Sequence, residues 1–113
     1  MNVKNMNADM VFRDESLTKR VLYEDKNVLS FLLNLRPGQS VPRHGHERST
    51  LVMEVLRGAG TIQVNDEQAN VKAGDFLTLT GADELAIPAV TEDLSLFVTL
   101  SPNPSNEMYA KEV

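Results

Sequence analysis

Short runs of Val, Leu, Ile, Phe and Thr recur along the chain, and turn signals rich in Gly, Pro, Asn and Asp separate them. No long stretch places apolar residues at helical spacing, whereas the length of these runs is typical of strands. Strands this regularly spaced favour a sandwich or a closed barrel, because open sheet edges tend to pair with other chains. The sequence therefore predicts an all-β fold. The expected strands span residues 10–12, 20–23, 28–35, 41–44, 50–56, 61–64, 69–71, 76–80, 84–87 and 94–100.

The turn signals divide the strands without marking a linker between domains. The Arg-Pro-Gly sequence at 36–38 is expected to turn the chain, Asn-Asp at 65–66 suits a tight hairpin, and Gly-Ala-Gly at 58–60 is expected to interrupt a strand. The 113 residues match the usual size of one compact domain. We therefore expect a single domain over residues 1–113, with 1–9 and 102–113 as surface extensions.

The composition excludes several classes of function. The chain has no cysteine, which rules out disulfides, thiolate zinc sites and thiol nucleophiles. Its formal net charge is −5, and its lysines and arginines are dispersed, so no basic stripe for nucleic acid is present. No apolar run approaches the roughly 20 residues that span a bilayer, and the first ten residues lack a signal-peptide core. We expect a cytoplasmic protein with a small-molecule or protein partner, and with neither nucleic acid nor membrane as partner.

Both histidines of the chain, His44 and His46, stand in the segment PRHGHERSTLVMEVLRG. Residues i and i+2 of a strand project from the same face, so the two imidazoles can converge on one point inside a barrel. The neighbouring Glu47 is expected to point to the opposite face. Metal sites usually have more than two protein ligands. The pair is therefore either the beginning of a metal site or a pair of hydrogen-bonding groups in a pocket.

The residues around this pair resemble the first motif of the cupins, a family of small jelly-roll barrels. That motif is a glycine, five residues, His-x-His, three or four residues, a glutamate, six residues and a glycine. Gly38, the histidine pair and Gly58 keep this spacing, but Leu51 replaces the glutamate. The resemblance covers residues 28–102 approximately. It implies a double-stranded β-helix, or jelly-roll barrel, that pairs as a homodimer and, where its motifs are intact, holds a transition metal.

The second cupin motif is largely missing from this chain. Its histidine position is taken by Leu85, and its proline and glycine are also replaced. A shift of register by one residue would bring Glu84 to that position, and a carboxylate can ligate iron, manganese or zinc. Because side chains alternate along a strand, Glu84 and Leu85 cannot both face the barrel interior. Two alternatives stay open: His44, His46 and Glu84 bind Fe, Mn, Ni or Zn, or the site holds no metal.

The replacement of two expected ligands by leucines favours a binding function. We expect the chain to bind a small, partly polar molecule in its barrel pocket, with weak or no metal. The expected pocket residues are His44, His46, Leu51, Leu85 and Arg43. Arginines that converge there could bind a carboxylate or a phosphate. The alternative is a metal-dependent enzyme, a dioxygenase-type oxidoreductase or an isomerase, that uses the two histidines and Glu84. Whether the chain catalyses a reaction stays open.

Overall fold

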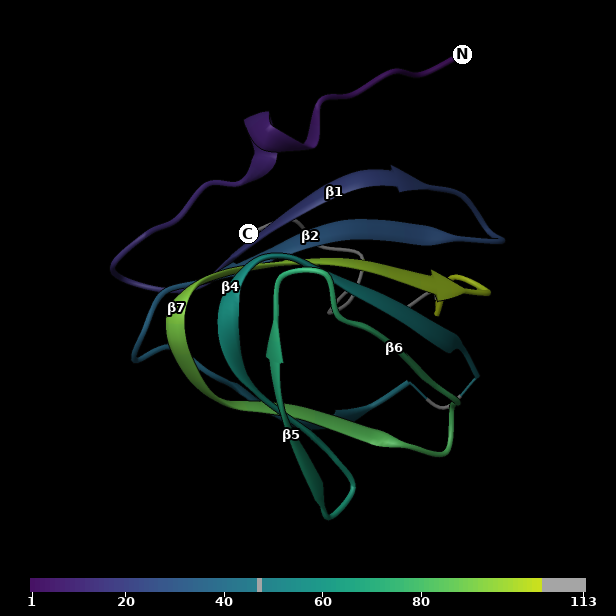
Figure 1. Cartoon of the computed structure of the whole chain (residues 1–113). Coiled ribbons are helices and arrows are strands. Elements are labelled where there is room, and N and C mark those ends of the chain that lie inside the picture. The colour runs from purple at the N-terminus through teal and green to yellow at the C-terminus, as the bar shows by residue number, and fades with distance from the viewer. Residues whose placement is uncertain (47, 105–113) are drawn as a thin grey trace.

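The computed structural model describes residues 1–46 and 48–104. This part of the chain contains seven β-strands and one short 3-10 helix, and no α-helix. The elements are η1 (Met6–Asp9), β1 (Thr18–Glu24), β2 (Leu29–Leu35), β3 (Val41–Gly45), β4 (Thr50–Val64), β5 (Glu67–Lys72), β6 (Phe76–Leu79) and β7 (Glu84–Ser101). The strands pair antiparallel in the order β1-β2-β7-β4-β5, with β3 paired to β7 and β6 to β4 (Figure 1). Among these residues, no helix is long and apolar enough to cross a membrane.

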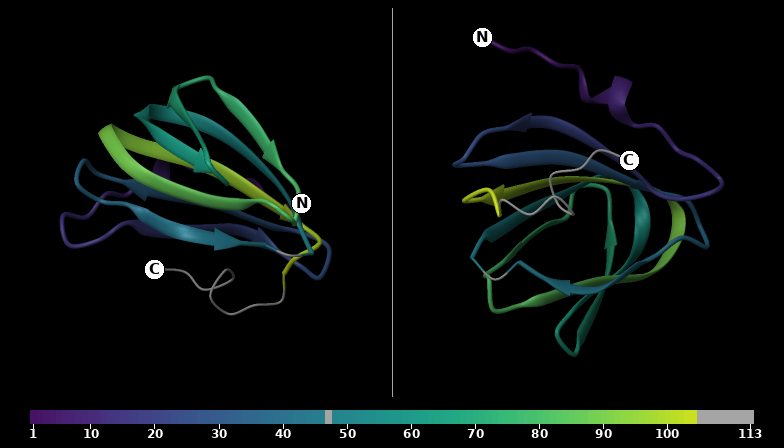
Figure 2. Two further views of the ribbon diagram at one scale, coloured as in Figure 1. Left: turned by 90° about the horizontal axis from the view of Figure 1, so that it is seen from below. Right: turned by 180° about the vertical axis from the view of Figure 1, so that it is seen from behind.

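β4 and β7 are long enough to belong to both sheets of the barrel. The first half of β4 pairs with the second half of β7, as in Met53 with Val98, and the remaining halves pair through Thr61 and Ala89. The register shifts between these halves. Figures 1 and 2 show the two strands curving around a common interior, with β1 and β2 on one side and β3 and β5 on the other. This arrangement confirms the predicted all-β jelly-roll barrel.

The bend in β4 requires glycine at Gly58. Its φ angle is +85°, and a Cβ atom there would lie 1.9 Å from the carbonyl oxygen of Asp93 on β7. A Cβ on Gly60 would lie 2.8 Å from the carbonyl oxygen of Ala89. The prediction that 58–60 interrupts a strand is therefore wrong, because these glycines instead let β4 continue while it passes close to β7.

Two pairs of predicted strands are accordingly continuous. The predicted strands 50–56 and 61–64 are both parts of β4, and 84–87 and 94–100 are both parts of β7. Each strand passes from one sheet to the other by bending where its register shifts, without a loop between its two halves. The number of strands is thus smaller than predicted, although the order of the apolar runs is as expected.

The segment before β1 packs on the barrel without forming a strand. The carbonyl oxygen of Val11 accepts a hydrogen bond from the Thr18 hydroxyl. The Cζ atoms of Arg36 and Arg57 lie 5.8 and 5.1 Å from the centroid of the Phe12 ring. The prediction of a strand over 10–12 is therefore wrong, because this segment is fixed by side-chain contacts instead of a sheet ladder.

A buried amide joins the end of this segment to the sheet. Asn34 on β2 is 1% exposed, and its Nδ2 donates to the carbonyl oxygen of Asp9 at 2.9 Å and to Thr18 Oγ1 at 3.1 Å. Its Oδ1 accepts a hydrogen bond of 2.7 Å from the buried Ser95 hydroxyl on β7. The expected extension 1–9 is thus anchored at its last residue, and the polar groups of Asn34 are satisfied inside the protein.

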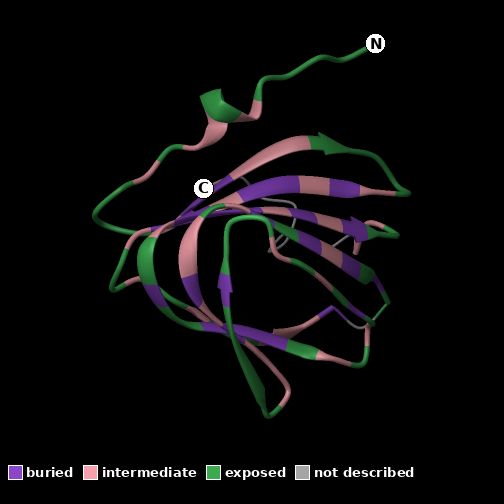
Figure 3. Cartoon of the chain, in the orientation of Figure 1, coloured by how far each residue is buried: buried purple, intermediate pink, exposed green. Residues whose placement is uncertain are grey.

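The apolar core lies between the two sheets and follows from side-chain alternation. Figure 3 shows buried and exposed positions alternating along the long strands. On β4, Leu51, Met53 and Val55 are buried, whereas Glu54 is exposed. The inward side chains of both sheets meet in one cluster. Six members of this cluster line the cavity described next, namely Phe31, Leu51, Met53, Leu85, Ile87 and Val98.

Candidate functional site

A cavity of about 420 Å³ opens into the barrel between the two sheets. Its volume falls in the range of about 300–1,000 Å³ that is typical of small-molecule sites. The apolar lining residues are Leu17, Phe31, Leu33, Val41, Pro42, Leu51, Met53, Leu85, Ile87 and Val98. The polar lining residues are Lys19, His44 and His46. The described wall is thus mostly apolar, with three nitrogen-bearing side chains.

The end of β3 brings the two histidines together, as their spacing on a strand predicts. His44 lies on β3 and His46 follows its last residue, and their ring centroids are 4.7 Å apart with an angle of 76° between the planes. His44 Nδ1 lies 2.9 Å from the carbonyl oxygen of Pro42. Because a carbonyl oxygen only accepts, Nδ1 is the donor, and the neutral tautomer of His44 carries its lone pair on Nε2.

His46 is the more buried of the two histidines, with an exposed fraction of 7%. Burial lowers its pKa to about 4, and the nearby charges of His44 and Lys19 act in the same direction. Each of these effects disfavours the imidazolium form. His46 is therefore a neutral imidazole near pH 7, able to donate one hydrogen bond and accept another.

Lys19 on β1 is a polar pocket residue that was not among the expected ones. Its exposed fraction is 7%, and its Nζ lies 4.2 Å from the centroid of the Phe31 ring, a cation–π contact. Burial lowers the pKa of Lys19 to about 8, although the carboxylate of Glu24 acts in the opposite direction. The sequence pattern that could have identified it is the alternation of Leu17, Lys19 and Val21, because every second residue of a strand faces the same side.

Leu51 and Leu85 form part of the cavity wall beside the histidines. Their exposed fractions are 2% and 4%. The pairing of β3 with β7 aligns His44 with Leu85, and Gly45 with Glu84. Side-chain alternation then turns Leu85 toward the cavity and Glu84 away from it. The structure therefore brings together four of the predicted pocket residues, namely the two histidines and the two leucines.

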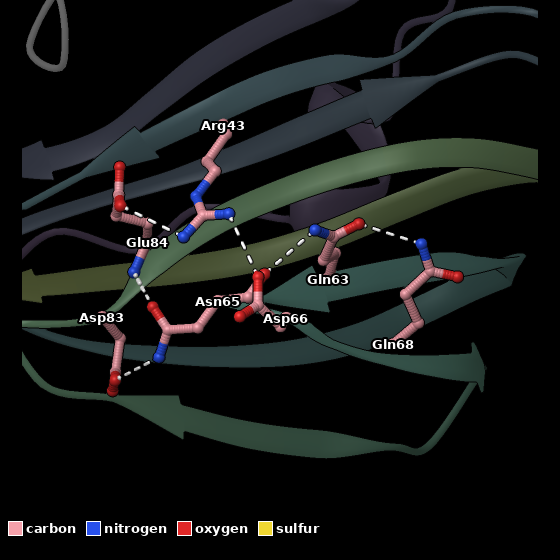
Figure 4. Close-up of polar contacts among 7 residues, drawn as sticks. All are labelled: Arg43, Gln63, Asn65, Asp66, Gln68, Asp83 and Glu84. Carbon is pink, nitrogen blue, oxygen red and sulfur yellow. Dashed lines mark hydrogen bonds and ion pairs between the residues drawn. The ribbon is translucent and has the colours of Figure 1, made fainter.

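Arg43 and Glu84 lie outside the cavity and contact each other (Figure 4). Arg43 Nη2 is 3.2 Å from Glu84 Oε1, and Arg43 Nη1 is 3.6 Å from Asp66 Oδ1. Arg43 stands between Pro42 and His44, which line the cavity, so its side chain projects from the other face of β3. The predictions that Arg43 lines the pocket and that Glu84 joins the histidines are therefore wrong in this structure.

A polar network fixes the chain around Glu84. The Oδ1 atom of Asn65 accepts a hydrogen bond from the backbone N–H of Glu84, and its Nδ2 donates to Asp83 Oδ1, both at 3.0 Å. Gln63 Nε2 donates to the carbonyl oxygen of Asn65 at 2.9 Å, and Gln68 continues the network (Figure 4). These bonds stabilise the register that keeps Glu84 outside and Leu85 inside the barrel.

The donor atoms that the described residues place around the cavity do not fit a resident transition metal. Within residues 1–46 and 48–104, no group of three or more His, Cys, Asp or Glu side chains could hold a metal ion. Leucines occupy the positions where an intact cupin motif has a glutamate and a histidine, and the nearby Lys19 ammonium opposes a further cation. Glu47 lies outside the described residues. Two imidazoles alone bind Fe, Mn, Ni or Zn weakly, so we derive no metal-dependent step.

Comparison with known proteins identifies the family. The family model of the cupin domain matches residues 31–91, which is more than half of the chain. The protein is a cupin. A search of curated proteins finds no match for it. The family resemblance seen in the first histidine motif is thus confirmed, even though two positions of the metal-binding pattern are leucines in this cupin.

Solved structures show the same fold as this cupin. An RmlC-like cupin from Desulfovibrio desulfuricans has a TM-score of 0.80 and 24% identity, and the match covers 90% of this chain and 97% of that one. The protein TT1209 from Thermus thermophilus has a TM-score of 0.83 and 23% identity, with 90% and 98% covered. An uncharacterized conserved protein from Klebsiella pneumoniae with a double-stranded β-helix domain has a TM-score of 0.83, 15% identity and 94% of each chain covered. These likenesses confirm the fold.

Proposed function

We propose that this cupin binds a small, largely apolar molecule with at least one polar group in its barrel cavity, without a resident metal. The observation that carries the proposal is the placement of Leu51 and Leu85 on the cavity wall beside the histidine pair. An apolar wall with a few localised polar groups is what binds and orients most small ligands. Contact with this wall would stabilise a complex by about 25 cal/mol per Å² of apolar surface removed from water.

The three polar side chains are suited to orient such a molecule. Lys19 enters from β1, whereas His44 and His46 belong to β3 and the residue that follows it. An ammonium group only donates hydrogen bonds, and a neutral imidazole can both donate and accept. A ligand oxygen near these groups would fix one end of the molecule while its apolar part contacts the leucines.

Met53 provides a direct reporter of binding. It lines the cavity and is 1% exposed, whereas Met1, Met6 and Met10 belong to the N-terminal segment outside the barrel. The test is a titration of methyl-¹³C-methionine protein with cyclohexylmethanol, followed by NMR. We expect a saturable shift of the Met53 signal and unchanged signals for Met1, Met6 and Met10. A Met53 signal that does not move up to the solubility limit of the alcohol overturns the proposal.

A pair of variants tests whether the probe occupies this cavity. Leu33 and Leu77 are both partly buried and packed against the core, but only Leu33 lines the barrel cavity. Leu77 instead lines a separate groove beside β5 and β6. We expect Leu33→Trp to fill the cavity and weaken binding by about tenfold or more, corresponding to at least about 1.4 kcal/mol. Leu77→Trp should leave the affinity within about twofold of wild type.

The homodimer and the cytoplasmic location stay predictions. Two-fold pairing is the commonest form of protein oligomer, and it is what the cupin resemblance implies. Light scattering over a wide concentration range measures the oligomeric state directly. A mass of twice 12.5 kDa is the expected result, and a concentration-independent monomer would remove the dimer from the account.

A further inference from the structure

We infer that the outer edge of β5 is an interaction surface for a second copy of this chain, which pairs with it antiparallel about a two-fold axis at Ala69. No residue of β5 is among the described residues that line the barrel cavity, so the inference does not depend on the ligand. β5 is the last strand in the order β1-β2-β7-β4-β5, and among the described residues it pairs with β4 alone (Figure 1). Its other edge therefore offers backbone groups to a further strand.

The backbone groups available at this edge belong to Gln68 and Asn70. A two-residue turn joins β4 to β5, so the residues that flank the turn form a hydrogen-bonded pair, and such pairs alternate along the ladder. The odd-numbered residues of β5 thus direct their N–H and C=O groups to β4, whereas Gln68, Asn70 and Lys72 direct theirs outward. Both groups of Lys72 are already used, since its N–H donates to Asp75 Oδ2 at 2.9 Å and its C=O accepts from the Asp75 N–H at 3.0 Å.

The side-chain amides of Gln68 and Asn70 are complementary to each other. Gln68 Nε2 donates to Gln63 Oε1 at 2.9 Å, and Asn70 Oδ1 accepts from Thr61 Oγ1 at 3.1 Å. Gln68 therefore presents its acceptor, Oε1, which points away from Gln63 in Figure 4, and Asn70 presents its donor, Nδ2. Both residues are exposed. A hydrogen bond can form between the two amides wherever Gln68 of one copy faces Asn70 of another.

These groups select one register of two-fold pairing. If Gln68 faced its own copy, two acceptors would meet, and if Asn70 faced its own copy, two donors would meet. When Gln68 faces Asn70 of the second copy, a donor meets an acceptor at both equivalent positions, and each facing pair also exchanges both of its backbone hydrogen bonds. This register places the axis at Ala69, whose small side chain lets the two strands approach closely.

The residues around this centre fit the same register. Lys72 of each copy faces Asp66 of the other, so opposite charges meet at both ends of the paired strands. The Asp66 side chain is 99% exposed, which leaves it accessible to a second copy. A groove of about 340 Å³ runs along β5, and its lining includes Phe76, which is 65% exposed. The second copy would remove part of this apolar surface from water.

A single introduced thiol tests the pairing, because the chain has no cysteine. At the axis, Ala69 and its copy form a pair without backbone hydrogen bonds, with Cα atoms about 4.5 Å apart, which is within the range of a disulfide. Ala73 is also exposed, but it would lie roughly 26 Å from its copy. We expect Ala69→Cys to form disulfide-linked dimers under air at least about tenfold faster than Ala73→Cys. Non-reducing gel electrophoresis measures both rates.

A proline at the edge tests the backbone hydrogen bonds without a thiol. Asn70→Pro removes an N–H that points away from β4, so the monomer should keep its fold, which thermal unfolding of dilute protein checks. We expect this variant to raise the dissociation constant of the dimer, measured by sedimentation, by about tenfold or more. Asn70→Ala keeps the N–H and loses only the amide pair, so its effect should be smaller. If Asn70→Pro does not fold, the comparison of the two thiols decides.

Each contrary outcome is distinct from a failure of the proposed function. Equal crosslinking of the two thiols, or a dissociation constant that a folded Asn70→Pro variant leaves unchanged, overturns the inference and shows that the copies pair through another surface. A monomer at every concentration also overturns it, and would leave the edge of β5 to a strand from a different protein. The titration of the Met53 signal tests the cavity independently of these results.

Discussion

His44 and Leu85 are direct partners in the pairing of β3 with β7. The second cupin motif has a histidine where this chain has Leu85, so an apolar side chain stands where a metal ligand would complete the site. Leu51, at the glutamate position of the first motif, lines the same cavity. The two leucines change the chemistry of the site while the barrel around it is retained.

Restoring both side chains should create a metal site. We predict that the double variant Leu51→Glu with Leu85→His binds one Co²⁺ per chain, with an affinity at least about tenfold higher than that of the wild type. The physical reason is that two further ligands would then face the same cavity as the histidine pair. Visible absorption during a cobalt titration measures the binding.

Two controls accompany this measurement. The variant Leu51→Gln with Leu85→Asn adds polarity but weaker ligands, and it should not gain the same affinity. Elemental analysis of the wild type grown with added metals should find much less than one equivalent. One tightly bound equivalent in the wild type would contradict the account of the site.

The buried histidine should make stability depend on pH. The pKa of His46 is about 4 in the folded protein and 6.5 in the unfolded reference, so the unfolded state binds more protons between these values. The free energy of unfolding should therefore fall as the pH is lowered from 6.5 to about 4, by at most about 3 kcal/mol from this group. Below this window, His46 contributes no further loss.

Urea unfolding at several pH values compares the wild type with His46→Gln. The carboxyl groups of Asp25 and Asp83, whose pKa values hydrogen bonds lower, are present in both proteins, so their contribution cancels in the difference. We expect the variant to lack the part of the slope that His46 supplies. Identical slopes in the two proteins would show that burial does not shift the pKa of this imidazole.

The crossing of β4 and β7 should tolerate no side chain at Gly58. A Cβ there would overlap the carbonyl oxygen of Asp93, whereas Gly38 has a similar φ of +91° and no atom within 4 Å of an added Cβ. We predict that Gly38→Ala costs about 1 kcal/mol through its backbone conformation alone. Gly58→Ala should cost at least about 2 kcal/mol more, because backbone atoms must move. Equal losses in urea unfolding would contradict the close approach of the strands.

The buried amide of Asn34 should contribute measurably to stability. Asn34→Ala removes hydrogen bonds to the Asp9 carbonyl, the Thr18 hydroxyl and the Ser95 hydroxyl. We predict a loss of about 2–3 kcal/mol in the free energy of unfolding, since buried polar partners are left unsatisfied. The exposed Asn70, which accepts one hydrogen bond from Thr61, provides the control. Asn70→Ala should cost less than about 0.5 kcal/mol.

The fold and half of the site follow from local patterns in the sequence. Apolar runs between turn signals predict the barrel, and the spacing of His44 and His46 places both rings on one face. The continuity of β4 through Gly58 depends on how closely β7 approaches, which is a tertiary contact that no local pattern records. The merging of predicted strands therefore could not be read from the sequence.

The remaining half of the site depends on strand registers and boundaries. The choice between Glu84 and Leu85 required the pairing of β3 with β7, which the network around Asn65 stabilises. Lys19 was missed because the predicted strand began at residue 20, one position too late to show its inward alternation with Leu17. Lys19 also lies 25 residues before His44 in the sequence, so no local motif connects it to the histidine pair.

A crystal structure grown with both zinc chloride and cyclohexylmethanol tests the central claim most directly. The account predicts electron density for the alcohol inside the barrel, with its hydroxyl near the histidine pair and its ring against Leu51 and Leu85. No anomalous zinc peak should lie between His44 and His46. A zinc ion bound by the two imidazoles, with the alcohol absent from the cavity, would contradict it.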